Sequence, residues 1–234
     1  MAALTDTREA IVIAGGGIAG LSLALALKQS LGSGFTIMVA DPALAKTSRP
    51  DNRAYAIAAA AQAMLGALGI WDAIAATAQP MTEMIVSDSR SGDVVRPVFL
   101  TFDGEVEPGQ PFAYMVGSAA LTAALTEACL AAGTVLRAES VASYDSDEHG
   151  VSIRLSGGEE LRARLLVAAD GARSKLREQA GIGWVGWDYG QSGLVATIGH
   201  ERPHGGRAVE HFLPSGPFAI LPLTDGGWLG HRSS

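Results

Sequence analysis

Cysteine is nearly absent from the sequence: Cys129 is the only one among 234 residues, which excludes a disulfide within the chain. It falls in an alanine-rich stretch with helical character, where we expect a small buried residue. The five histidines form no evident metal site, because Pro203 interrupts any helix that would align His200 with His204 and no cysteine or carboxylate cluster lies at a suitable spacing. We therefore predict no metal site.

Positive charge is also in short supply. Lys and Arg number 17 against 24 Asp and Glu, which gives a formal net charge of -7 at pH 7. A nucleic-acid binder needs a basic surface that meets the phosphates. The charge balance therefore argues against a nucleic-acid partner.

Long apolar runs are missing as well. A membrane-spanning helix needs about 18 or more consecutive apolar residues, and Lys28 and Gln29 interrupt the best candidate. The first ten residues include Asp6 and Glu9 and lack the basic start and apolar run of a secretory signal. Both absences favour a cytoplasmic protein.

Glycine and small apolar residues are plentiful. The 29 glycines, 48% apolar residues and 18% charged residues are typical of a soluble α/β protein. Residues 9–14 predict a short buried strand, and a helix is expected from about Gly17 to Leu31. Between them, Gly15, Gly17 and Gly20 have the spacing G-x-G-x-x-G, in the strand-to-helix order of dinucleotide-binding proteins.

Each of these glycines has a physical reason in such a site. Gly15 can make the tight turn, Gly17 lets a diphosphate approach the backbone, and Gly20 lets the helix pack closely on the strand. Ile18 and Ala19 lie in the first helical turn, whose unpaired N–H groups bind an anion without a basic side chain. We predict that all five residues bind a cofactor.

An acid follows the next predicted strand. Residues 35–40 form a second apolar stretch, and Asp41 comes directly after it, at a distance suited to the ribose hydroxyls of an adenosine. FAD and the nicotinamide dinucleotides share this adenosine diphosphate, so the motif alone does not choose between them.

Downstream residues carry a resemblance to a known family. Asp51, Asn52 and Arg53 form a D-x-R pattern, and the predicted helix 58–68 closes in L-G-I-W at residues 68–71. This arrangement resembles the class A FAD-dependent aromatic monooxygenases of the para-hydroxybenzoate hydroxylase type, most closely the ubiquinone-biosynthesis hydroxylases. The resemblance implies that Arg53 contacts FAD; the alternative is a surface arginine on a loop.

A second motif supports the same resemblance. Residues 165–174 read L-L-V-A-A-D-G-A-R-S, an apolar strand that ends in Asp170 and Gly171. They are similar to the family's D-G motif, which lies near the FAD ribitol and diphosphate; an ordinary turn is the alternative. Val141 completes the residues that we expect to bind the cofactor. One departure is Ser118 and Ala119, where relatives often have an amide and an arginine.

Two further glycine patterns are misleading. Gly181, Gly183 and Gly186 repeat G-x-G-x-x-G but lead from a helix toward a strand, the reverse of the order that aims N–H groups at phosphate. Gly92 and Asp93 imitate the family's third motif, yet we place them in a polar hairpin turn. The third motif itself is expected beyond residue 234, so we interpret the chain as truncated.

The expected fold is α/β: a Rossmann-like, three-layer FAD/NAD(P)-binding domain interleaved with an antiparallel substrate-domain sheet, incomplete at its C-terminal end. We assign 1–80 and 104–183 to the first domain, and 81–103 and 184–234 to the second. Strands 84–87 and 94–100 are expected to pair, as are strands 151–155 and 161–167.

The resemblance implies an enzyme that hydroxylates an aromatic ring with FAD, NAD(P)H and O2, and a polyprenylphenol of ubiquinone biosynthesis as substrate. Such a substrate would draw the protein to the surface of the inner membrane or into a quinone-biosynthesis complex. Because the cofactor performs the chemistry, no catalytic side chain is predicted. Two alternatives stay open: a flavin-dependent prenyl reductase on the same scaffold, and an inactive FAD-binding fragment.

Overall fold

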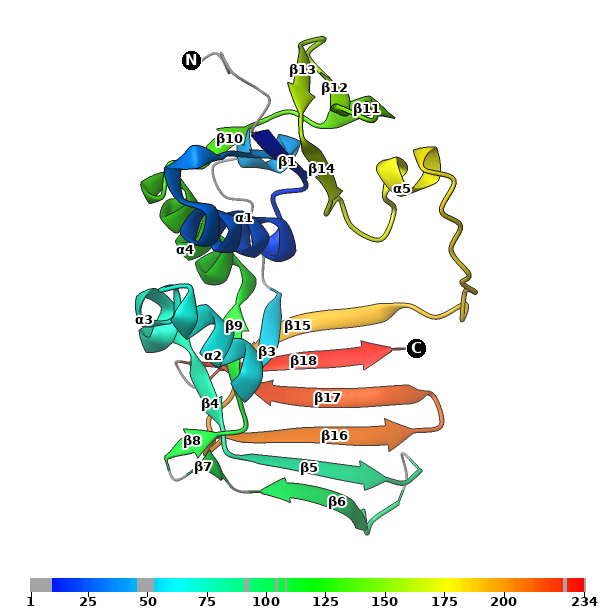
Figure 1. Cartoon of the computed structure of the whole chain (residues 1–234). Helices are drawn as coiled ribbons and strands as arrows, with labels where there is room; N and C mark the ends of the chain where they lie inside the picture. Colours follow the sequence, from blue (N-terminus) through cyan, green and yellow to red (C-terminus); the bar gives the residue numbers. More distant parts are fainter. Residues whose placement is uncertain are drawn as a thin grey trace. The chain divides into compact units, whose positions relative to one another are not determined.

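The computed structural model describes residues 10–45, 53–90, 93–103, 105–107, 109–224 and 227–233. The chain divides into two compact units, the first from residues 1–49 and 122–185 and the second from residues 50–121 and 186–234. Both units are assembled from segments that are distant in sequence (Figure 1). The units divide the chain at other positions than the expected functional domains, whose limits stay a prediction.

A parallel sheet forms the centre of the first unit. Its strand order is β10-β2-β1-β14, with bounds β1 (Ala10–Ala14), β2 (Thr36–Ala40), β10 (Val135–Arg137) and β14 (Leu165–Ala168). All residues of β1 are buried, as in a strand covered on both faces. Helix α1 (Ile18–Leu31) and the 3-10 turns η1 (Gly32–Gly34) and η2 (Pro42–Ala45) flank β2 in the chain.

Helix α4 (Ser118–Ala131) lies against α1. The buried thiol of Cys129 donates a hydrogen bond to the Leu21 carbonyl oxygen of α1, at 3.3 Å. Burial raises the pKa of this thiol. The expectation of a small buried residue at this position is therefore confirmed.

A second, antiparallel sheet of the first unit packs on the parallel one. It consists of β11 (Val141–Asp147), β12 (Gly150–Leu155) and β13 (Glu160–Ala163), and the short helix α5 (Lys175–Gln179) follows in the chain after β14. Val12 and Met38 of the parallel sheet share one apolar core with Ile153, Leu155 and Leu161. This shared core fixes the two sheets on each other.

The prediction of one strand over residues 161–167 is wrong. Strand β13 pairs with β12, whereas β14 pairs with β1 in the parallel sheet. The change of partner falls at Arg164, whose N–H donates to the Ala10 carbonyl oxygen at 2.8 Å. The sequence pattern of residues 161–167 shows no break, although the chain there forms two strands that belong to different sheets.

The second unit contains a six-stranded sheet, which Figure 1 shows as one layer of long strands. Its order is β15-β18-β17-β16-β5-β6, with bounds β5 (Glu83–Asp88), β6 (Val98–Asp103), β15 (Gly193–Gly199), β16 (Arg207–Leu213), β17 (Gly216–Pro222) and β18 (Gly227–Ser233). The expected antiparallel pairing holds between all neighbours except β5 and β16, which run parallel. The expected start of β6 at Val94 is wrong: β6 begins at Val98, because Pro97 has no N–H to donate to a ladder.

Smaller elements complete this unit. A three-stranded antiparallel sheet has the order β3-β9-β4, and a two-stranded sheet pairs β7 with β8. Short helices lie between β3 and β4 in the chain. The bounds are β3 (Ala54–Ala58), α2 (Ala59–Ala67), α3 (Trp71–Ile74), η3 (Ala75–Thr77), β4 (Gln79–Met81), β7 (Glu105–Glu107), β8 (Gln110–Pro111) and β9 (Ala113–Gly117). Trp71 packs edge-on against Tyr114, with ring centroids 4.8 Å apart.

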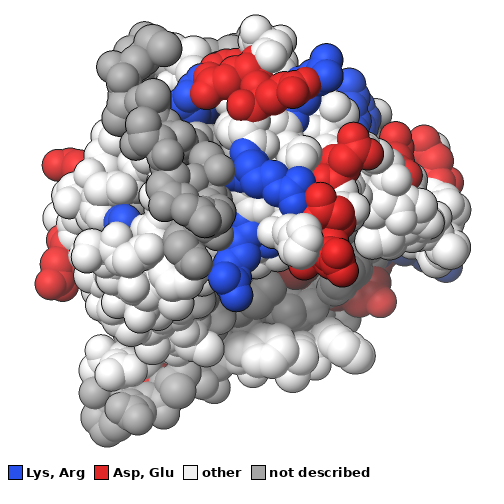
Figure 2. Space-filling model, turned by 45° about the horizontal axis from the view of Figure 1, so that its top comes forward, with Lys and Arg blue, Asp and Glu red and all other residues white. Residues whose placement is uncertain are grey.

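Two global properties bear on possible partners. Within the described part of the chain, no lone helix has the length and apolarity to cross a membrane; the bent pair of α2 and Trp71–Thr77 meets those criteria only when the two are joined. Figure 2 shows a face on which Lys and Arg side chains lie between groups of Asp and Glu. Mixed charge of this kind is consistent with the negative net charge.

Candidate functional site

Glycines shape the loop after β1. Gly15 has a φ of +116°, and its N–H donates to the Ala40 carbonyl oxygen at 2.9 Å. A Cβ on Gly15 would lie 2.2 Å from the Ala169 carbonyl oxygen, and one on Gly20 would lie 2.0 Å from the Gly15 carbonyl oxygen. A side chain at either position would displace backbone, so the tight turn and the close helix packing both require glycine.

Gly17 is free of such contacts. A Cβ there would meet no atom within 4 Å, so the space in front of α1 is open. Gly17 is the N-cap of α1, and the first helical turn, which includes Ile18 and Ala19, has no acidic residue. The first N–H groups of a helix lack intrahelical acceptors and carry partial positive charge. This helix end can therefore accept an anionic group through its backbone.

Asp41 is held at the end of β2 by two backbone amides. Its Oδ2 accepts a hydrogen bond from the Gly16 N–H and its Oδ1 accepts one from the Ala43 N–H, each at 2.7 Å. A carboxylate has about four lone-pair sites, so each oxygen can still accept a hydroxyl proton. The two amides thus orient an acceptor beside the glycine loop.

A cavity of about 630 Å³ lies at the carboxyl ends of β1, β2 and β14. In open parallel sheets this end of the strands is where ligands bind. Six of the ten predicted cofactor-binding residues line the cavity: Gly15, Gly17, Asp41, Val141, Asp170 and Gly171. The structure therefore brings together residues that are up to 156 positions apart in the chain, from Gly15 to Gly171.

The other four predicted residues lie elsewhere. Ile18, Ala19 and Gly20 belong to the first turn of α1 behind the loop. Arg53 is exposed and belongs to the second unit, where its carbonyl oxygen accepts the Ser118 N–H at 2.8 Å. The positions 51 and 52 of the D-x-R pattern lie outside the described residues. A contact between Arg53 and a cofactor stays a prediction.

Several cavity residues were not predicted from the sequence, among them Ser140, Ala142, Arg173 and Lys175. The two cations flank Ser174, whose buried Oγ caps α5 by accepting the Arg177 N–H at 3.0 Å. Their place directly after the D-G motif is a signal that sequence reasoning could have used. Ser140 and Ala142 carry no such signal, because only tertiary packing brings them to the cavity.

The two misleading patterns do not lie between a strand and a helix, as the glycine loop after β1 does. Within residues 180–192, all of which the structure describes, no helix or strand is formed. Asp93 lies between β5 and β6, where its N–H donates to the Arg90 carbonyl oxygen at 3.1 Å and its Oδ2 accepts the Arg90 N–H at 2.9 Å. Gly92 lies outside the described residues. In the described part of the chain, no three His, Cys, Asp or Glu residues are grouped as metal ligands.

Fold and site together define a dinucleotide-binding α/β protein. The chain belongs to the FAD binding domain family, which it matches over residues 8–223.

Curated relatives are similar along nearly the whole chain. Ubiquinone hydroxylase UbiL of Rhodospirillum rubrum is 42% identical over 226 residues, covering 96% of this chain and 50% of the relative. The 3-demethoxyubiquinol 3-hydroxylase of Escherichia coli is 36% identical over 229 residues, covering 95% of this chain and 56% of the relative. The chain thus spans about half the length of these relatives.

Solved structures agree on the fold. A variant of P. aeruginosa PqsL superposes with a TM-score of 0.81 at 20% identity, covering 97% of this chain and 61% of that chain. A Klebsiella pneumoniae HpxO variant complexed with FAD gives a TM-score of 0.74 at 23% identity, covering 96% of this chain and 56% of that chain. The predicted α/β fold class is confirmed.

Proposed function

We propose that the cavity of the first unit binds the adenosine diphosphate half of FAD. In this arrangement the diphosphate lies against Gly17 and the N-terminus of α1, and the ribose hydroxyls donate to Asp41. The observation that carries the proposal is the cavity that Gly17 and Asp41 share with Asp170 and Gly171.

The chemistry of these residues fits the cofactor. An open backbone position and unpaired N–H groups suit a diphosphate, and the cations of Arg173 and Lys175 at the cavity wall favour its charge. Asp41 offers oriented lone pairs to a diol. We assign Gly15 and Gly20 to building the loop, and Val141, Asp170 and Gly171 to the cavity wall beside the cofactor.

We further propose that the complete enzyme hydroxylates an aromatic ring with NAD(P)H and O2. FAD, when bound, would supply the redox chemistry; the residues of this chain bind and orient it and keep water away from the reacting ring. The relatives' names support a polyprenylphenol of ubiquinone biosynthesis as substrate. Association with a membrane surface or a quinone-biosynthesis complex belongs to the same proposal, as does the division into cofactor segments 1–80 and 104–183 and substrate segments 81–103 and 184–234.

Titration of the purified chain with FAD tests the cofactor site. Asp41→Ala should weaken FAD binding about tenfold or more, because the ribose loses its acceptor. Asp145→Ala, which removes an exposed carboxylate of β11, is the matched control and should bind FAD as the wild type does. Equal affinity of the two variants would place the nucleotide elsewhere.

The reaction requires a separate measurement. A C-terminally extended protein should oxidise NADPH in the presence of a prenylphenol. Mass analysis of the product should then show one oxygen added to the prenylphenol. A product with two added hydrogens in the prenyl chain would instead indicate a reductase. Comparison of the extended protein with the 234-residue chain tests whether this part is active alone.

A further inference from the structure

Arg137 occupies a particular place beside the cavity. It is the last residue of β10, and its carbonyl oxygen accepts the Asp41 N–H at 3.0 Å. The proposed ribose acceptor is therefore tied by its own backbone to Arg137.

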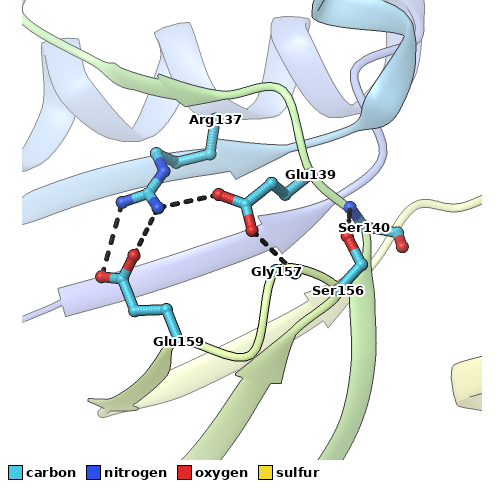
Figure 3. A network of polar contacts seen from close by, with 6 residues as sticks. All are labelled: Arg137, Glu139, Ser140, Ser156, Gly157 and Glu159. Carbon is cyan, nitrogen blue, oxygen red and sulfur yellow. Dashed lines mark hydrogen bonds and ion pairs between the residues drawn. The ribbon is translucent and has the colours of Figure 1, made fainter.

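The side chain of Arg137 joins two other segments (Figure 3). Its Nη2 donates to Glu139 Oε1 at 2.8 Å and also to Glu159, which lies between β12 and β13. Both carboxylates thus share one guanidinium, and the arginine side chain is only 21% exposed. The charge of a partly buried arginine that pairs with two carboxylates is screened less by water than that of a single surface ion pair.

Glu139 and Ser140 extend the network toward the cavity. Glu139 Oε2 accepts the Gly157 N–H at 3.0 Å, and a Cβ at Gly157 would lie 2.4 Å from that oxygen, so a side chain there would make the Glu139 carboxylate shift. Ser140 donates its N–H to Ser156 Oγ at 3.2 Å and accepts the Ser156 N–H at 2.9 Å. Ser140, Val141 and Ala142 then line the cavity.

We propose that Arg137 is a positioning residue of the dinucleotide site, because it holds residues 139–142 in place as one wall of the cavity. This inference rests on the proposed FAD site and adds a residue that does not itself line it. Loss of the guanidinium leaves Glu139 and Glu159 as two carboxylates that repel each other across the gap. The wall and the end of β2 then lose their common anchor.

Hydrogen exchange in the ligand-free chain is the first test. In Arg137→Gln, the Ser140 and Gly157 amides should exchange about tenfold faster or more than in the wild type. Arg154→Gln is the matched control, since Arg154 pairs with Glu160 on the same hairpin but is 60% exposed and does not line the cavity. Wild-type exchange at Ser140 and Gly157 in Arg137→Gln would overturn the proposal, whether or not the chain binds FAD.

Affinity for FAD and for ADP is the second test. Arg137→Gln should raise both dissociation constants about tenfold, and Arg137→Lys should recover part of the loss because it keeps one cation. Faster exchange with unchanged affinity would reduce Arg137 to a purely structural residue and contradict the proposal. A wild-type chain that binds neither ligand would refute the FAD site itself. The exchange measurement distinguishes this failure from a failure of the Arg137 proposal, because it is made on the ligand-free chain. If Arg137→Gln does not fold, Glu159→Gln replaces it in both tests.

Discussion

Gly20 and Gly66 are both glycines within helices, yet their surroundings predict opposite effects of an added methyl group. In Gly20→Ala the new Cβ would meet the Gly15 carbonyl oxygen at 2.0 Å, so α1 must move away from β1. We expect a loss of about 1–3 kcal/mol in the free energy of unfolding, measured by denaturant titration.

The control is Gly66→Ala in α2, where a Cβ would meet no atom within 4 Å. Alanine should there raise stability by about 0.5–1 kcal/mol, because it restricts the unfolded chain and favours the helix. A similar gain in stability in both variants would show that helix propensity, rather than the contact with Gly15, decides the result.

Gly17 separates binding from folding. A methyl group at Gly17 has open space in front of it, so Gly17→Ala should leave the free energy of unfolding of the ligand-free chain within about 1 kcal/mol of the wild type. The same methyl group would stand where the diphosphate approaches the helix, and FAD affinity should fall about tenfold or more. Thermal unfolding and FAD titration of one preparation check both expectations, and unimpaired binding would contradict the placement of the diphosphate.

At the scale of elements, the β11–β13 sheet contains an ion pair that depends on pH. Arg162 of β13 donates to Asp147 at the end of β11, and this hydrogen bond holds the Asp147 pKa below its ordinary value, with a smaller contribution from the His149 N–H. A pKa lowered on folding contributes stability above the unfolded value, and that contribution is lost as the pH falls through the native pKa.

Asp147→Asn should therefore be less stable than the wild type at pH 7, with a difference that shrinks below about pH 4. Urea unfolding at several pH values between 7 and 3 measures the difference. Asp145→Asn on the same strand is the matched substitution without the arginine partner. A constant difference for Asp147→Asn across this range would show that its effect is not due to the charge of Asp147.

At the scale of the whole molecule, the division into two units predicts which part of the chain a bound cofactor stabilises. The proposed cavity is lined only by residues of the first unit. Free FAD at 100 times its dissociation constant should stabilise that unit by about 2.7 kcal/mol. Hydrogen exchange with and without FAD should show protection in residues 10–45 and 122–185, and protection centred on β16 to β18 would contradict the assignment.

Local sequence order predicted the start of the fold well. A buried strand, a glycine loop, a helix and an acid after the next strand each depend on neighbours in the chain, and β1, α1 and Asp41 lie where the pattern indicates. The strand before Asp170 is also local, because a run of apolar residues ends at a turn. Such features follow from backbone geometry and burial within about thirty residues.

Pairings between distant segments could not be predicted in this way. At Arg164 the pairing partner changes: β13 pairs with β12, whereas β14 pairs with β1. This change, like the parallel pairing of β16 with β5, depends on which strand lies alongside in the folded molecule. The same holds for Ser140 at the cavity and for the bridge from Arg137 to Glu159. No local spacing encodes these neighbours.

The amino-acid order alone determined the family, the dinucleotide motif and the negative charge, since these need only residue types and short spacings. Tertiary structure decided which residues surround the cavity, how Asp41 is oriented and which side chains contact the segment 139–142. The physical reason is that hydrogen bonds and packing act between atoms a few ångströms apart, and only the folded chain brings residues such as Arg137 and Glu159 to that distance.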